Sequence, residues 1–324
     1  MKKPYNYLHI LVLFFSVQSV QIYGQQTEID TNIQSEYNHA IKLFNSKAYA
    51  AAQKYFIEVS ENSTIKNDLK ANADYYDAMC AIKLNQTNAD KKVTSFVNNY
   101  PSSTKKDRAY FNVGNYYFAN KKAAYALKWY SKVNLDALSL ANKKEINFKM
   151  GYAFLSTRNL DLAKNKFVLL INDPKYGNDS RYYFGYISYK QEDYEIAEKT
   201  LEEIADDEAY KSEVTYYLLD ISFKAGRFEK CIEVGLKLLE NAKPKEVSEI
   251  SKIIGESYFN LKKYKESIDY LKAYRGKKGK WNNTDYYQLG YAFFKQNDYE
   301  NAVNNFNKII DEKNNVSQKA YYNL

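Results

Sequence analysis

Histidine and cysteine are scarce in this 324-residue chain, which has two of each. His9 lies near the N-terminus, so His39 is the one histidine in the remainder of the sequence. Cys80 and Cys231 are far apart and form no Cys-x-x-Cys pair, and we expect both to be unpaired. Metal centres made of His and Cys, and Ser–His or Cys–His nucleophiles, lack their usual residues here. We therefore expect no catalytic residue, no bound metal and no cofactor.

Proline and glycine are also scarce, with 4 and 11 residues. Signals for tight turns and hairpins are correspondingly few. Hydrophobic residues make up 45% of the chain, which is enough for a packed core. These numbers favour an all-α fold of helices joined by short polar turns. The residue in excess is tyrosine, with 34 copies.

Long apolar runs are absent after the N-terminal segment. A lysine pair precedes the apolar stretch Leu8–Val20, and the small residue Gly24 follows it. This layout is typical of a secretory signal peptide, and the stretch is shorter than the ~20 residues of a membrane-spanning helix. We expect residues 1–24 to be a signal peptide, with a retained anchor as the alternative, and residues 25–32 to be a short linker. The remainder would be exported, with no segment that spans the membrane.

Two runs of like charge are candidate ligand sites. Arg275, Lys277, Lys278 and Lys280 could contact phosphate or an acidic partner, and the acidic residues of 202–208 could hold a divalent cation. We interpret both runs as solvated surface, because Lys and Glu are interleaved along the chain and the formal net charge is only +8. Nucleic acid is not an expected partner of an exported protein.

A repeat of about 34 residues runs through the sequence. It is marked by a glycine beside apolar or aromatic residues and by a second small residue twelve positions later. The first column contains Ala40, Asp77, Gly114, Gly151, Gly185, Leu219, Gly255 and Gly290, and the second contains Ala52, Ala89, Ala126, Ala163, Ala197, Cys231, Ser267 and Ala302. This pattern predicts about eight helix–turn–helix units over residues 33–316. The unit at about 70–103 is degenerate, because Asp77 replaces the glycine.

The unit around Gly185 shows the expected anatomy. A polar turn is expected at 191–193, between two amphipathic helices. Tyr194, Ala197, Leu201 and Ile204 form an apolar stripe of helical period in the second helix. Glycine inside a helix costs ~1 kcal/mol relative to alanine. We therefore interpret Gly185 as a notch that, with the Ala197 column, lets the paired helices approach closely.

The pattern resembles that of the tetratricopeptide repeat family. The match is carried most clearly by Leu289, Gly290, Phe293, Tyr299, Ala302, Phe306 and Ile309. The resemblance implies an α-solenoid, a right-handed superhelix of antiparallel helix pairs whose first helices form a concave, partner-binding wall. The tryptophan usual in the first helix is missing. Residues 317–324 align with the opening of another repeat, which predicts a truncated unit of a longer array.

The family's inner positions are largely aromatic in this chain. Tyrosine offers broad apolar contact with a polar tip, which suits a peptide groove. Bracing of the next repeat is the alternative role for each residue, and we expect His39 to be packed rather than catalytic. The candidate partner-binding groove consists of Phe148, Tyr152, Tyr182, Tyr186, Tyr189, Tyr216, Phe223, Tyr287, Tyr291 and Phe294.

The sequence thus predicts a non-enzymatic scaffold or adaptor. Its expected partners are proteins or peptides bound on the aromatic-lined wall, in the periplasm or in a cell-envelope complex. Two alternatives stay open, a self-assembling structural array and a non-catalytic domain of a larger envelope enzyme.

Overall fold

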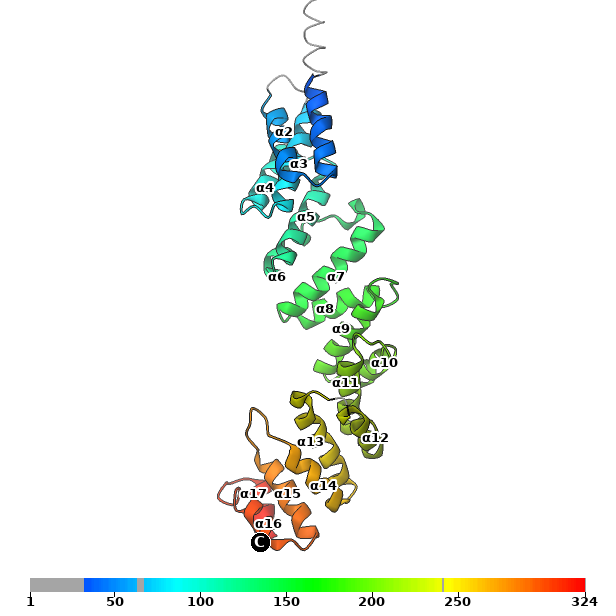
Figure 1. Cartoon of the computed structure of the whole chain (residues 1–324), viewed down its shortest axis with the longest axis vertical. Coiled ribbons are helices and arrows are strands. Elements are labelled where there is room, and N and C mark those ends of the chain that lie inside the picture. Colours follow the sequence, from blue (N-terminus) through cyan, green and yellow to red (C-terminus); the bar gives the residue numbers. More distant parts are fainter. Residues whose placement is uncertain (1–31, 63–66, 241, 324) are drawn as a thin grey trace, which may run out of the picture. The chain divides into compact units, whose positions relative to one another are not determined.

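The computed structural model of the chain describes residues 32–62, 67–240 and 242–323. Helices make up the regular structure of these residues (Figure 1), apart from one isolated antiparallel bridge between Lys277 and Lys280. The expected all-α fold is confirmed. None of the described helices is long and apolar enough to cross a membrane. The predicted signal peptide and residues 25–31 of the predicted linker lie outside the described residues, and Asn32 is the first residue of a helix.

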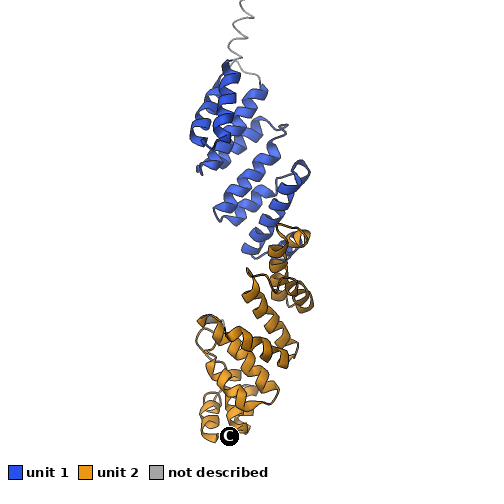
Figure 2. Cartoon of the chain, turned by 45° about the vertical axis from the view of Figure 1, so that its right-hand side comes forward, with its two compact units in different colours: residues 1–166 blue, residues 167–324 orange. Residues whose placement is uncertain are grey.

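The chain divides into two compact units, residues 1–166 and residues 167–324 (Figure 2). The first contains a helix over 32–45, α2 (Tyr49–Glu61), α3 (Asn67–Lys83), α4 (Ala89–Asn99), α5 (Lys106–Ala119), α6 (Ala123–Tyr130), η1 (Leu135–Ala137), α7 (Leu140–Ser156) and most of α8 (Leu160–Phe167). The second contains η2 (Val168–Leu170), α9 (Gly177–Lys190), α10 (Tyr194–Glu202), α11 (Lys211–Lys224), α12 (Phe228–Leu239), α13 (Pro244–Asn260), α14 (Tyr264–Ala273), α15 (Asn283–Lys295), α16 (Tyr299–Phe306) and α17 (Asn315–Tyr322).

The turn inside each helix pair has one recurring geometry. After α9, Glu192 has φ 63°, and the Asp193 N–H donates to the Ser188 carbonyl oxygen at 2.9 Å. This hydrogen bond and the left-handed residue before it form a Schellman motif, which satisfies carbonyl groups at the end of the helix. The turn expected at 191–193 is therefore confirmed. The equivalent left-handed residues elsewhere in the described chain are Lys47, Asn85, Lys121, Arg158, Gly226, Lys262 and Asn297.

The glycine notch is real, but the residue that fills it is not in the Ala197 column. A β-carbon on Gly185 would lie 2.7 Å from atoms of the Leu201 side chain, sixteen residues later. The same relation joins Gly114 to Tyr130 and Gly290 to Phe306. These distances are too short for non-bonded carbon atoms, so a side chain at the notch would separate the helices.

The α11–α12 pair departs from this relation. Leu219 occupies the glycine column of α11, and the residue sixteen positions later in α12 is Gly235. A β-carbon on Gly235 would lie 2.6 Å from Ile254 of α13. The same β-carbon would lie 3.8 Å from Leu219, an ordinary contact distance, so Gly235 makes room for α13 rather than for Leu219.

Asp77, the least typical residue of the glycine column, is held by polar contacts. Its carboxylate accepts hydrogen bonds from Gln53 Nε2 at 2.8 Å and from Lys92 Nζ at 2.6 Å. The contacts link α3 to the helices on either side of it. The unit predicted at 70–103 is thus a polar variant of the same packing, while the exact repeat boundaries and the truncated repeat at 317–324 stay predictions.

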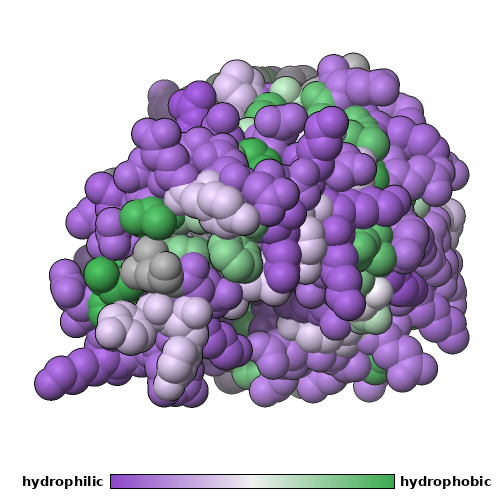
Figure 3. All heavy atoms as spheres, turned by 90° about the horizontal axis from the view of Figure 1, so that it is seen from below, coloured by the Kyte–Doolittle hydropathy of each residue, from purple (hydrophilic) through white to green (hydrophobic). Residues whose placement is uncertain are grey.

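Both cysteines are in the core, whereas the described histidine is at the surface. Cys80 and Cys231 are buried free thiols, and burial raises the pKa of Cys80 to about 12. His39, expected to pack, is exposed but places its ring edge against Tyr55, with 4.9 Å between ring centroids. The face of the molecule in Figure 3 is mainly hydrophilic, with hydrophobic side chains in small separate groups.

Candidate partner-binding site

The ten candidate groove residues lie on first helices of the predicted pairs. Nine are half-buried, and Tyr152 is 42% exposed. Two lie in the first compact unit and eight in the second. By helix they are Phe148 and Tyr152 on α7; Tyr182, Tyr186 and Tyr189 on α9; Tyr216 and Phe223 on α11; and Tyr287, Tyr291 and Phe294 on α15.

The three α9 residues belong to a dense group of rings, the tyrosine cluster, made of Tyr182, Tyr186, Tyr189, Tyr210 and Tyr217. Tyr182 stacks on Tyr210 with 4.4 Å between ring centroids, and Tyr217 lies 5.0 Å from Tyr189 and 5.7 Å from Tyr186. Such ring pairs stabilise beyond their buried area. The cluster therefore joins α9 to α11 as a structural contact.

Hydrogen bonds and burial fix the cluster further. The Tyr189 hydroxyl donates to Asp220 Oδ2 at 2.6 Å, and the Tyr210 hydroxyl donates to Asp179. Burial raises the pKa of Tyr189 to about 12 and also raises the pKa of Tyr182 and Tyr217. These phenols are protonated at neutral pH and present hydroxyl groups in fixed positions.

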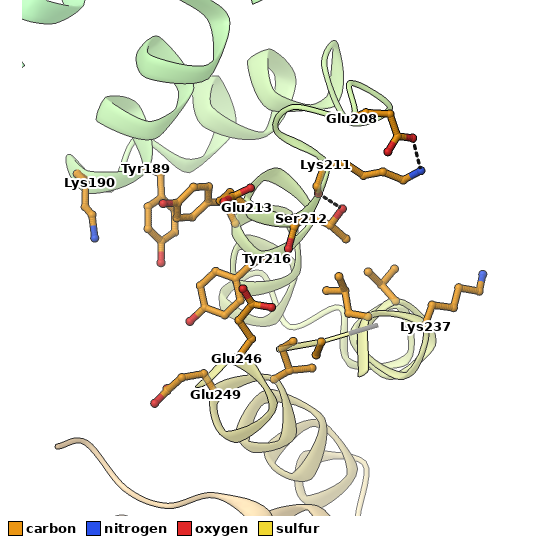
Figure 4. A pocket seen from close by; sticks show the side chains of 16 residues that line it. Tyr189, Lys190, Glu208, Lys211, Ser212, Glu213, Tyr216, Lys237, Glu246 and Glu249 are labelled. Carbon is orange, nitrogen blue, oxygen red and sulfur yellow. Dashed lines mark hydrogen bonds and ion pairs between the residues drawn. The ribbon is translucent and has the colours of Figure 1, made fainter. Parts of the chain in front are cut away.

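A pocket of about 880 Å³ opens beside the cluster, between α9, α11, α12 and α13 (Figure 4). One wall is aromatic and the other is aliphatic. Tyr189, Tyr216 and Tyr217 form the aromatic wall, and Val234, Leu238 and Ile250 contribute the aliphatic one. The volume is within the range of about 300–1,000 Å³ typical of ligand-binding pockets.

The same pocket has charged groups at its edge. Glu213 lies on α11 and Glu246 and Glu249 lie on α13, and in Figure 4 these carboxylates surround Tyr216. Burial and the nearby Glu249 raise the pKa of Tyr216. Glu246 interacts with its own helix start, because its carboxylate accepts the Lys243 N–H at 3.0 Å.

The other candidate residues do not line this pocket. Phe223 packs against Phe228 with 5.6 Å between ring centroids. On α15, Tyr287 lies 6.0 Å from the buried Phe306, and Tyr291 and Phe294 flank the same hydrophobic core. Tyr152 meets Phe118 edge to face at 5.8 Å. The structure thus brings Tyr189 and Tyr216 into one pocket and gives most of the others bracing contacts.

Several pocket residues were missed from the sequence. Tyr217 adjoins a chosen position, and Glu213 lies one helical turn before Tyr216, so the i, i+3 spacing of α11 could have found it. Val234 and Leu238 lie on a second helix, and the inner-wall rule excludes that helix. The acidic run at 202–208 forms surface contacts, including an ion pair between Glu203 and Arg181 at 2.6 Å. No group of potential metal ligands occurs among the described residues.

Residues 286–312 match the sequence model of the tetratricopeptide repeat. This segment contains most of α15 and all of α16, one helix pair with a glycine notch and a Schellman turn. The Naa15/Naa10 complex bound to HypK-THB has the same fold over 86% of this chain and 42% of its own, with a TM-score of 0.56 and 14% identity. Residues 286–312 are therefore identified as a tetratricopeptide repeat, and the likeness over the rest of the chain is one of fold.

Two other solved structures are similar to this chain at lower scores. A tetratricopeptide repeat protein from Parabacteroides merdae has a TM-score of 0.41 and 15% identity, covering 84% of this chain and 98% of its own. PilF of Pseudomonas aeruginosa has a TM-score of 0.48 and 16% identity, covering 67% of this chain and 97% of its own. No curated protein matches the sequence.

Proposed function

We propose that this protein is a scaffold or adaptor that binds a segment of a partner protein in the pocket between α9, α11 and α13. The observation that carries this proposal is the pocket itself, with tyrosines on one wall and aliphatic side chains on the other. Aromatic residues at the centre of an interface supply much of the binding energy in protein complexes. The family's general use as a binding surface agrees with this role.

The pocket is prepared for binding because its aromatic wall is already ordered. Tyr189 is held by Asp220 and by Tyr217, so little conformational entropy remains to be lost when a partner arrives. Order of this kind before binding increases affinity. We therefore infer a binding role for the pocket and no catalytic one. Its tyrosines and glutamates are not paired with a nucleophile or a positioned base.

Export is the second part of the proposal. It is supported by the basic start, short apolar stretch and small residue of segment 1–24. In a diderm bacterium the protein would act in the periplasm or within a complex of the cell envelope. Its partners would then be proteins with a segment in the same compartment.

A photo-crosslinking amino acid at Tyr216 tests the proposed site. The protein, freed of segment 1–24, is irradiated in an extract of the source cell envelope and crosslinked products are identified by mass spectrometry. We expect a partner protein at this position and none with the crosslinker at Tyr299, a 57% exposed residue of α16. Crosslinks at Tyr299 alone would place the partner elsewhere. Crosslinks to a second copy of this chain would favour the self-assembling array.

A further inference from the structure

The pocket carries unpaired negative charge in a chain that is positive overall. The formal net charge of the chain is +8, yet four carboxylates stand at the pocket edge, those of Glu208, Glu213, Glu246 and Glu249. Glu213 and Glu249 form no ion pair or hydrogen bond with any residue that the structure describes. Both are therefore available to an incoming cation.

The lysines at the same edge are already engaged. Lys211 pairs with Glu208 at 3.3 Å, and Lys237 pairs with Glu233 at 2.8 Å. Lys190 places its ammonium group 5.5 Å from the ring centres of Tyr186 and Tyr189. In Figure 4, Lys211 and Lys237 lie away from Glu249, on the opposite side of the pocket. Two carboxylates without an ion pair, those of Glu213 and Glu249, therefore outnumber the one such ammonium group among the described pocket residues, that of Lys190.

The walls indicate what kind of cation fits. Tyrosine faces attract cations, and this attraction is stronger for a partly desolvated site. Lysine, in the way Lys190 meets Tyr189, already shows such a contact in this protein. The aliphatic wall of Val234, Leu238 and Ile250 requires an apolar neighbour for the cation, which a free metal ion cannot provide.

We infer that the pocket binds a basic peptide segment in which an arginine or lysine adjoins an apolar residue. Arginine fits best, because its planar guanidinium stacks on aromatic rings and forms paired hydrogen bonds with carboxylates. This inference rests on the proposed function and adds the chemistry of the partner. It gives Glu213 and Glu249 the role of cation acceptors and Tyr216 that of the stacking surface between them.

Three fluorescently labelled hexapeptides test the inference by anisotropy. One alternates Arg with Leu, one replaces Arg by Gln, and one replaces Arg by Glu. We expect the Arg peptide to bind at least about 10-fold more tightly than the Gln peptide, since hydrogen bonds to charged groups exceed neutral ones in strength. Its affinity should fall as salt is raised, and the Glu peptide should bind most weakly.

Matched variants locate the effect. Glu213→Gln with Glu249→Gln should weaken the Arg peptide about 10-fold or more and leave the Gln peptide unchanged. The control, Glu195→Gln with Glu229→Gln, alters net charge equally at two exposed residues of α10 and α12, and should leave affinity within about twofold.

Four results would overturn the inference. Equal binding of the Arg and Gln peptides, or equal loss in the control variant, would show that the two carboxylates do not select the ligand. Competition by spermidine at the concentration at which the Arg peptide itself binds would show a site for free polycations. Absence of binding by all three peptides would exclude this basic class of segment. Because crosslinking at Tyr216 is independent of peptide charge, it decides separately whether the pocket is a partner site at all.

Discussion

Adjacent first helices in the second unit meet through two different chemistries. Between α9 and α11 the contact is aromatic, made by the tyrosine cluster, and a pocket opens beside it. Between α13 and α15 it is ionic. There, Lys252 donates to Asp285 Oδ1 at 2.8 Å, with Glu256 3.9 Å from Lys252. The exposed fractions of the Lys252 and Asp285 side chains are only 22% and 4%.

The two contacts occupy equivalent positions in the repeat. Tyr182, Tyr216 and Lys252 share one column, and Tyr186 and Glu256 share the next. Where the column is tyrosine, the rings stack along the helices and one edge remains open to a ligand. Where the column is charged, the side chains form ion pairs, one of which joins neighbouring repeats. The same backbone position can therefore brace the array or build a site, depending on whether its side chain finds a partner within the chain.

The strongest test of this contrast removes one anchor from each contact. Asp285→Ala leaves the largely buried Lys252 with only Glu256, at 3.9 Å, and removes the carboxylate that accepts the Asn282 N–H at the start of α15. Loss of one member of a buried pair costs about 3–5 kcal/mol. Tyr189→Phe, which removes the hydroxyl that donates to Asp220 and leaves the Asp220–Lys224 ion pair in place, should cost about 1 kcal/mol. Urea unfolding measures both, and equal losses would show that the contacts are energetically equivalent.

Overpacking the helix pairs gives the next largest effect. Ala197→Leu places a larger side chain at a fully buried position of α10 and should destabilise by about 1–3 kcal/mol. Ser267→Leu, in the same column of α14, should cost more, because it also removes the hydrogen bond from Ser267 Oγ to the Gly255 carbonyl oxygen at 2.8 Å. The exposed Ile196→Leu is the control for both. A melting temperature that is unchanged in Ala197→Leu would contradict the close approach of α9 and α10.

The stability of the two contacts should respond to pH in different ranges, that of the ionic contact in acid and that of the aromatic contact in alkali. Burial raises the pKa of Glu256 above 4.5 and that of Tyr189 from 10.0 to about 12. For a raised acid pKa, the unfolded state loses its proton first, so stability falls as pH rises past the unfolded value. The stabilising effect of Glu256→Gln relative to wild type should therefore grow as pH rises from about 4.

The ionisation of Tyr189 at alkaline pH can be followed by tyrosinate absorbance. The difference in tyrosinate absorbance between wild type and Tyr189→Phe should titrate with a midpoint near pH 12. Stability lost between pH 10 and that midpoint should be smaller in the variant. A difference titration centred at 10 would mean that Tyr189 is not desolvated, and the tyrosine cluster would then lack its assigned packing.

The repeating features of the fold could be predicted from sequence because each appears many times. The glycine notch, the turn and the apolar stripe recur at a constant spacing, so an exception such as Leu219 is visible. The interpretation of Gly235, which makes room for Ile254 of α13, could not be anticipated from the glycine column alone. It requires knowing that α13 packs against this position of α12.

The site was less predictable, for a physical reason. The inner-wall positions identify which residues face the neighbouring first helix. They do not identify whether another side chain of the same chain packs against them there. Tyr287 packs on Phe306, whereas Tyr216 remains beside an opening, although both are tyrosines in one column. That difference depends on the size of residues from α12 and α13, such as Leu238 and Ile250, which approach only in the folded chain.

The smallest expected effect concerns the turns of the two regions, which use different residues for the same backbone shape. Gly226 has φ 73° after α11, and Lys262 has φ 59° after α13. A residue with a β-carbon pays roughly 1–2 kcal/mol for left-handed backbone, partly offset by the roughly 0.5–1 kcal/mol of extra entropy that glycine loses on folding. Lys262→Gly should therefore stabilise by about 0.5–1 kcal/mol, and Gly226→Ala should destabilise by a similar amount. Thermal unfolding of both single variants measures the two signs, and peptide binding serves as the control, because neither residue touches the pocket. A loss of stability in Lys262→Gly would show that the lysine side chain stabilises the turn by more than its backbone strain costs.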